Sequence, residues 1–394
     1  MYWFLLFGSI CTFLSAFQIA VDARAAIVIN PENNAVLFEK KADDLQFPAS
    51  LTKIATALYV VEKEGLDFER EISPSEEALY SVRGEKKQAN WTIYPSHRLE
   101  HDSTVLGLRP GKKLPLWTAF YGMLICSAND CANALAESYG KSIPDFVASM
   151  NRYLQEIGCE KTHFTNPHGL HHPSHVTTAR ELALIAKKAL SYPVFQEPFS
   201  AKGFVYQQVG KQARQIEHKN RLVLPNSKFY YPSATGGKNG YTEASLYSLL
   251  ATAKQGEREL LVVLLGAPSK AKSFEEVIKL FESAFSEEKV QSVFVERASL
   301  FTKPLKRDHR SVQARLQEDS IACYYPSEKP RDIKAQIRWD ELTLPIKQGD
   351  RVGEIEVISK CEVLQKKPLY AVRSIDKTFG QKVRSFLRNL FFFL

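Results

Sequence analysis

Ser50 and Lys53 are the first residues whose types and spacing indicate chemistry. They lie in Pro48-Ala49-Ser50-Leu51-Thr52-Lys53, just before an apolar run over residues 54–61 that is typical of a helix. Residues three apart on a helix share a face. A serine is a weak nucleophile until a base takes its proton, and a lysine in an apolar setting can be that base. A helix cap with a surface lysine remains the alternative, since this spacing is common by chance.

A second triplet, Ser127-Ala128-Asn129, falls in a turn between two stretches with helical patterns. A hydroxyl there can pass a proton between a base and a leaving amine. The amide of Asn129 can hold a peptide group, because it offers a donor and an acceptor together. Asp130 follows directly, and we expect it to cap or brace the next helix.

A third triplet, Lys238-Asn239-Gly240, precedes a pair of apolar runs. A cation at Lys238 can bind a carboxylate or tune a proton relay. The glycine lets a substrate backbone lie close to a strand edge. Backbone N–H groups of Ser50 and Tyr241 would suit an oxyanion hole. Each triplet alone is unspecific, but the order SxxK, SxN, KxG, spaced by 77 and then 111 residues, indicates an acyl-serine enzyme.

The elements that must position these residues follow from periodicity. Alternation and turn residues predict strands at 26–30, 35–39, 246–253 and 259–265, and three- to four-residue spacing predicts helices at 116–125, 132–139, 143–157, 178–190 and 274–285. We therefore expect an α/β catalytic domain over residues 26–286, with an antiparallel sheet flanked by helices. Short, turn-punctuated segments over residues 290–372 predict a separate small all-β domain.

The chain of 394 residues is long enough for two such domains, and its formal net charge of +8 is spread along it. That charge makes no case for nucleic acid as a partner. The six cysteines form no CxxC pair, and Cys126 and Cys131 are expected to pack in the core. Four histidines, at positions 168, 171, 172 and 175, are expected to form a structural loop rather than a metal site.

Both ends of the chain carry apolar stretches. Residues 3–20 are uncharged and apolar, which predicts a secretory signal peptide over residues 1–25, with cleavage near Ala23 or Ala25; an uncleaved anchor is the alternative. Residues 376–394 predict a basic amphipathic helix that is too short to span a bilayer. We expect it to lie in a membrane interface, although docking on the protein would also bury its apolar face.

The three triplets, with Asn166-Pro167-His168-Gly169-Leu170, resemble the penicillin-recognising serine enzymes. The closest resemblance is to the low-molecular-mass penicillin-binding proteins that are D-alanyl-D-alanine carboxypeptidases. It runs over nearly the whole chain, because the signal peptide, catalytic domain, small β-domain and amphipathic tail are in the family's order. The resemblance implies removal of the terminal D-alanine of peptidoglycan pentapeptides, acylation by β-lactam antibiotics, and no metal or organic cofactor. It also implies a location at the periplasmic face of the bacterial inner membrane.

The same resemblance assigns roles by motif. It implies that Ser50 attacks the carbonyl, that Lys53 is its base and that Ser127 relays protons. Asn129 would hold the substrate amide and Lys238 would help bind the terminal carboxylate, with Gly240 and Tyr241 as further substrate-binding residues.

Asn239 departs from the family pattern, which usually has threonine there to help hold the carboxylate. The segment over residues 84–101 also looks like extra length. A D,D-endopeptidase, a weak β-lactamase, or a peptidoglycan-binding scaffold that has lost activity are the alternatives.

Overall fold

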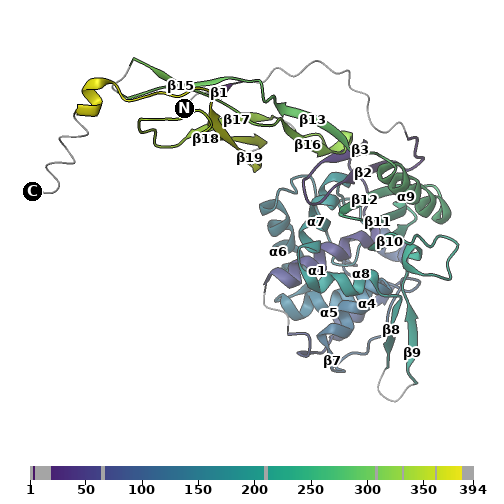
Figure 1. The fold of residues 1–394 in the computed structure, drawn as a ribbon. Helices are drawn as coiled ribbons and strands as arrows, with labels where there is room; N and C mark the ends of the chain where they lie inside the picture. The colour runs from purple at the N-terminus through teal and green to yellow at the C-terminus, as the bar shows by residue number, and fades with distance from the viewer. Residues whose placement is uncertain are drawn as a thin grey trace, which may run out of the picture. The chain divides into compact units, whose positions relative to one another are not determined.

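The computed structural model describes residues 3–4, 19–63, 67–207, 212–306, 309–330, 332–359 and 362–383. The chain divides into two compact units, and it passes from the first to the second between Ser286 and Glu287. The first unit contains the catalytic triplets and the second is built of strands. Each is described by itself below (Figure 1).

The centre of the first unit is a five-stranded antiparallel sheet in the order β10-β11-β12-β2-β3. Its strands are β2 (Ala25–Ile29), β3 (Val36–Lys40), β10 (Ala234–Thr242), β11 (Leu246–Gln255) and β12 (Arg258–Ala267). The N-terminal hairpin therefore joins strands from the far end of the unit. This confirms the predicted α/β class with an antiparallel sheet.

Both faces of this sheet are covered, so its central strands are apolar on both sides. Ile27 and Val263 face a core shared with most of the helices, whereas Val28 and Val262 face the helix α9 (Lys270–Phe285). Successive side chains of a strand point to opposite faces, which explains this alternation. Figure 1 shows α9 on one side of the sheet and α1 and α7 on the other.

The helix after Ser50, α1 (Thr52–Lys63), lies at the centre of the unit. Every residue from Thr52 to Val60 is buried, Lys53 included. The apolar run over residues 54–61 predicted the helix but not its burial on all sides. The structure differs because α1 packs against several helices, namely α4 (Leu116–Ile125), α5 (Asn129–Tyr139), α6 (Ile143–Glu156) and α7 (Ala179–Leu190). A helix enclosed in this way must carry apolar side chains on every face, or polar side chains whose hydrogen bonds are all made within the protein.

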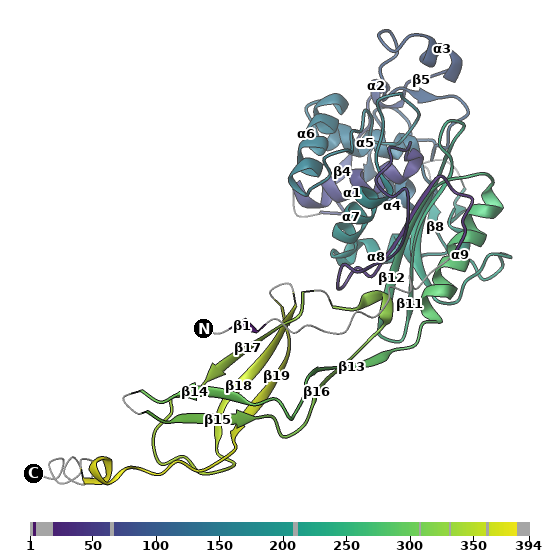
Figure 2. The ribbon, with the colours of Figure 1, turned by 90° about the horizontal axis from the view of Figure 1, so that it is seen from above.

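Shorter elements form the rim of the unit. They are α2 (Glu76–Leu79), α3 (Gly84–Ala89), α8 (Gln196–Ser200) and the strand pairs β4 (Glu71–Ile72) with β7 (Leu114–Pro115), β5 (Ser81–Val82) with β6 (Leu99–Glu100), and β8 (Gly203–Tyr206) with β9 (Arg214–Glu217). Figure 2 shows α2, α3 and β5 together at one end of the unit.

Residues that precede position 26 also pack in the first unit. Val21 and Ala23 are buried, and Ala25 is already part of β2, opposite Leu265. The backbone N–H groups of Asp22 and Ala23 donate to the carboxylate of Glu276, at 2.6 and 3.2 Å. The small residues that suggested a cleavage site are therefore structural parts of this unit.

The second unit is an all-β domain. Its strands are β13 (Val290–Val295), β14 (Phe301–Pro304), β15 (Ser311–Arg315), β16 (Ser320–Tyr324), β17 (Lys334–Trp339), β18 (Arg351–Ser359) and β19 (Glu362–Ala371). They enclose a core of their own that includes Val312, Val352 and Leu369. This confirms the predicted small all-β fold after the catalytic domain.

The C-terminal tail is described only as far as Val383, so most of the predicted amphipathic helix lies outside the described residues. Phe379 is 84% exposed. Among the residues that the structure describes, none of the helices is both long and apolar enough to cross a membrane.

Candidate active site

Ser50 lies in a single turn of 3-10 helix (Ala49–Leu51) that leads directly into α1. The residue before it, Ala49, has a φ of +48°, a left-handed conformation that non-glycine residues rarely adopt. Gly169 packs on this turn so closely that a Cβ there would lie 1.9 Å from the carbonyl oxygen of Ala49. The backbone around Ser50 is thus held in a strained shape by the neighbouring loop.

Lys53 contacts Ser50 as the spacing predicted. Its Nζ lies 2.9 Å from Ser50 Oγ, 2.7 Å from Asn129 Oδ1 and 2.6 Å from the carbonyl oxygen of His168. An ammonium group would donate one N–H to each of these acceptors. A neutral amine would keep its two N–H bonds to Asn129 and His168 and turn its lone pair to the hydroxyl of Ser50. That second arrangement is the one a general base needs.

The surroundings of Lys53 favour the neutral amine. Burial in the core holds the pKa of Lys53 well below the usual value for lysine, and the nearby Lys238 cation lowers it further. Asp130 acts in the opposite direction, since its negative charge raises the pKa of Lys53. Burial is the largest of these effects.

Ser127 lies in the turn between α4 and α5, where it also adopts a left-handed conformation, with φ of +67°. Its Oγ accepts a hydrogen bond from Lys238 Nζ at 2.8 Å. Since Asn129, two residues on, contacts Lys53, this turn joins the two lysines in one site. The structure therefore brings together residues that are 77 and 188 positions from Ser50.

Lys238 is fully buried within β10, an edge strand of the sheet. Burial lowers the pKa of this lysine to about 7. The sequence placed Lys238 just before a strand pair and missed β10 itself, because the segment Ala234–Thr242 contains three glycines and lacks an apolar alternation.

The remaining predicted residues follow Lys238 along β10. Gly240 passes so close to Ser50 that a Cβ there would lie 2.9 Å from the Ser50 nitrogen. Tyr241 is half exposed, and its ring lies 4.5 Å from that of Tyr247. The Oδ1 atom of Asn239 is buried and has no hydrogen-bond partner in the structure.

Two contributors were not predicted from the sequence. The carbonyl oxygen of His168 accepts a hydrogen bond from Lys53. Because every residue has a backbone carbonyl, the residue type at this position could not indicate the contact. Asp130 does more than brace its helix, since its carboxylate accepts hydrogen bonds from the backbone of residues 106–108. Only the Asn166–Leu170 motif could have drawn attention to His168.

The loop that carries His168 contacts the segment over residues 84–101, which the sequence analysis singled out. The buried imidazole of His168 accepts the N–H of Leu170 at Nδ1 and donates from Nε2 to the carbonyl oxygen of His97. His175 stacks on Phe164 and contacts Thr52. Among the described residues, no group of three metal-ligating side chains gathers here or elsewhere.

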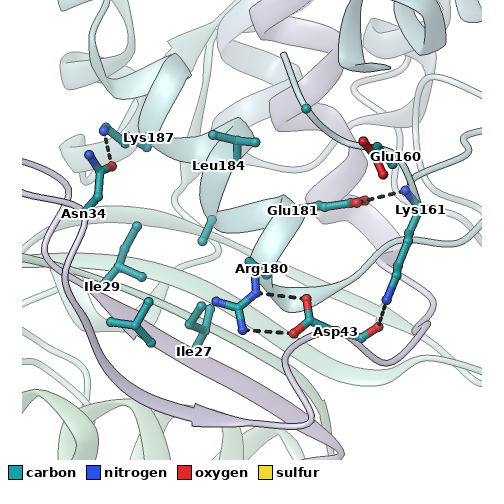
Figure 3. A pocket seen from close by; sticks show the side chains of 13 residues that line it. Ile27, Ile29, Asn34, Asp43, Glu160, Lys161, Arg180, Glu181, Leu184 and Lys187 are labelled. Atoms are coloured by element: carbon teal, nitrogen blue, oxygen red, sulfur yellow. Dashed lines mark hydrogen bonds and ion pairs between the residues drawn. The ribbon is translucent and has the colours of Figure 1, made fainter. Parts of the chain in front are cut away.

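A separate pocket of about 420 Å³ lies between α7 and the hairpin β2–β3 (Figure 3). Its lining includes the apolar residues Ile27 and Ile29, and several of its charged groups have partners. Arg180 binds Asp43, and Lys187 contacts Asn34. The catalytic triplets do not line it.

These features are the ones expected of a serine acyl-transfer site on a sheet-and-helix scaffold, and family models identify the family of the chain. Residues 13–269 match the family D-alanyl-D-alanine carboxypeptidase of peptidase S11, and residues 301–377 match the penicillin-binding protein 5 C-terminal domain. The chain therefore belongs to the S11 D-alanyl-D-alanine carboxypeptidases, a family of penicillin-binding serine hydrolases.

Individual relatives match over most of the chain. D-alanyl-D-alanine carboxypeptidase DacF of Bacillus subtilis is 26% identical over 91% of this chain and 87% of its own, and DacC of Escherichia coli is 29% identical over 91% and 85%. Among solved structures, carboxypeptidase DacD from Francisella tularensis matches with a TM-score of 0.63 at 23% identity, covering 92% of this chain and 96% of that one. That similarity shows the fold.

Proposed function

We propose that Ser50 is the nucleophile of an exported D-alanyl-D-alanine carboxypeptidase that removes the terminal D-alanine from peptidoglycan pentapeptide stems and is acylated by β-lactams. The observation that carries this proposal is the 2.9 Å contact between Ser50 Oγ and a fully buried Lys53. A buried lysine with a lowered pKa beside a serine hydroxyl is the arrangement that activates a serine without histidine.

In the proposed acylation, Ser50 Oγ attacks the carbonyl carbon of the penultimate D-alanine, and its proton passes to Lys53. The developing oxyanion is stabilised by the backbone N–H groups of Ser50 and Tyr241. Collapse breaks the peptide C–N bond, and Ser127 relays the proton held by Lys53 to the departing amine of D-alanine, so that Ser127 keeps its hydroxyl and Lys53 becomes neutral again. Water then attacks the acyl ester and gives a proton to Lys53. The ester C–O bond breaks, that proton returns to Ser50 Oγ, and the shortened stem leaves as a carboxylic acid.

Binding of the peptide would use the edge of β10. An extended substrate can pair with an edge strand, and Gly240 leaves room for its backbone next to Ser50. Asn129 would hold the substrate amide, while Lys238 and Asn239 would face the terminal carboxylate. Lys238 is then an electrostatic partner for the carboxylate as well as for Ser127.

This function is tested by incubating the protein with a pentapeptide ending in D-Ala-D-Ala and measuring free D-alanine. We expect release by the wild type and none by Ser50→Ala. Cross-linked dimers and a chromogenic cephalosporin separate the alternatives, because an endopeptidase would prefer the dimer and a β-lactamase the cephalosporin. A folded wild type that releases no D-alanine, but binds peptidoglycan, would establish the scaffold alternative instead.

We also propose that the mature protein is attached to the outer surface of the cytoplasmic membrane through its C-terminal tail. The tail carries Lys382, Arg384 and Arg388 beside many apolar residues, a composition that suits the interface of an anionic bilayer. Deletion of residues 379–394 should move the mature protein from the membrane fraction to the supernatant. Retention in membranes would assign the anchor to the N-terminal segment.

Removal of the signal peptide would have to occur before Val21. Cleavage after Ala25 would delete two N–H donors to Glu276, which is only 5% exposed, and leave its carboxylate without them. A buried carboxylate that loses its donors costs about 1–3 kcal/mol or more. Mass spectrometry of the mature N-terminus checks this, and a chain that starts at residue 26 would contradict it.

A further inference from the structure

Asp130, directly after the Ser127-Ala128-Asn129 turn, is a buried carboxylate with an unusual set of partners. It is 2% exposed and lies in the first turn of α5. Its Oδ1 accepts the N–H groups of Leu106 and Cys131, both at 2.9 Å. Its Oδ2 accepts those of Gly107 and Leu108, at 2.8 and 3.0 Å. All four partners are donors, which suits a carboxylate anion.

These contacts fix the loop over residues 104–108 against the catalytic turn. The same loop is tied down twice more, since Asn129 N–H donates to the carbonyl oxygen of Thr104 at 2.8 Å and the Arg214 side chain donates to that of Leu106. Asn129 is thereby held at its backbone by the loop and at its side chain by Lys53. Any movement of the loop is transmitted to the residue that orients the base.

The charge of Asp130 also reaches Lys53. Four ionisable groups are close enough for their charge to affect the pKa of Lys53. They are Lys238 on β10, Cys126 at the end of α4, and Asp130 and Cys131 on α5. Burial raises the pKa of both thiols, so they are uncharged at neutral pH. Asp130 is therefore the negative charge within this set, and it opposes the Lys238 cation.

We propose that Asp130 is a positioning residue with two roles in acyl transfer: it anchors the loop over residues 104–108 against Asn129, and its charge stabilises the Lys53 ammonium that forms when Ser50 loses its proton. This inference rests on the proposed function of Ser50 and Lys53. A proton arriving on a buried amine creates a charge in a medium of low dielectric, and a fixed anion nearby lowers that cost.

The test is the pH profile of penicillin acylation for Asp130→Asn, measured as the second-order rate constant. The variant keeps the volume of the side chain and removes its charge. It also places the NH2 group of the new amide against backbone N–H groups of the loop, where two donors cannot form a hydrogen bond. The acidic limb of the profile is the range in which the rate constant rises with pH as Lys53 loses its proton. Without the anion the pKa of Lys53 falls further, so this limb should move to lower pH by roughly half a unit or more. The plateau should fall at least about tenfold, because the base is weaker and the loop is displaced.

Glu181→Gln is the matched control. Glu181 is a buried carboxylate in the first turn of α7, bonded to Lys161 N–H and Thr162, and it is absent from the groups that act on Lys53. This variant should lose stability and keep the acidic limb of the wild type. Asp130→Glu retains the charge but displaces the carboxylate, so its plateau should fall while its acidic limb stays in place.

The outcomes separate the two proposals. A wild type that is not acylated contradicts the proposed function itself. If the wild type is active and the acidic limb of the pH profile of Asp130→Asn coincides with that of Glu181→Gln, the electrostatic role is refuted. If Asp130→Asn does not fold, Asp130→Glu decides: a plateau within threefold of the wild type refutes the positioning role, and an acidic limb shifted as far as half a unit refutes the electrostatic one.

Discussion

We predict that Gly169 fixes the geometry of Ser50, the proposed nucleophile, and Gly169→Ala tests this directly. Its φ is +91°, and a Cβ at this position would lie 1.9 Å from the carbonyl oxygen of Ala49 and 3.0 Å from the nitrogen of Ser50. Because Cβ atoms essentially never come within 3.0 Å of such an atom, one of the two backbones must move by at least about 1.1 Å. The backbone that moves carries either Ser50 or the carbonyl oxygen of His168 that binds Lys53.

A displacement of about 1 Å at reacting groups costs roughly 100-fold in rate. We therefore expect Gly169→Ala to lower the acylation rate constant by about that factor. The measurement is stopped-flow acylation with a fluorescent penicillin, alongside urea unfolding.

Gly158→Ala is the control for backbone strain. Gly158 has a similar φ of +96°, but a Cβ there meets only Leu184 at an ordinary 3.5 Å. Both variants pay the cost of a left-handed alanine, about 1 kcal/mol. Only Gly169→Ala should lose activity. Equal acylation rates in the two folded variants would refute the claim that Gly169 fixes the Ser50 turn.

Three further predictions concern β10. Lys238→Ala should raise the pKa of Lys53 by removing a neighbouring cation, which moves the acidic limb of acylation to higher pH; an unchanged limb in a pH–rate profile would show that the two lysines are uncoupled. In the wild type, the KM for the peptide should rise above about pH 7, where Lys238 loses the proton that attracts the carboxylate; a KM that is flat from pH 6 to 9 would argue against this role. Asn239→Thr should raise kcat/KM for D-Ala-D-Ala peptides about tenfold, since a hydroxyl can bond the carboxylate where the amide leaves Oδ1 unpaired; a lower value would show that this site is adapted to asparagine.

Most residues of the candidate site could be found from the sequence because the triplets are local patterns. Ser50 with Lys53, and Ser127 with Asn129, each lie within four residues, and the structure places them in contact or in one turn. The hairpin β2–β3, the pair β11–β12 and the main helices were predicted for the same reason, since periodicity is a local property. The C-terminal β-domain followed from its short, turn-punctuated segments.

What sequence reasoning missed depends on contacts between distant segments. Lys53 and Lys238 are buried by segments distant in the sequence, since Lys53 contacts Asn129 and His168 and Lys238 contacts Ser127. A lysine is normally a surface residue, so its type does not reveal this burial. Asp130 binds backbone groups 22 to 24 residues earlier in the chain. The packing of the small residues near Ala23 was also missed, because they match a cleavage site and their contact with Glu276 spans about 250 residues of sequence.

The central claim is that Ser50 is the residue that becomes acylated. Intact-mass spectrometry after incubation with benzylpenicillin, followed by peptide mapping, tests it most directly. We predict one penicilloyl adduct per chain, located on the peptide that contains Ser50 and absent in Ser50→Ala. An adduct on any other residue, or a folded wild type that gains no mass while a related carboxypeptidase does, would contradict it.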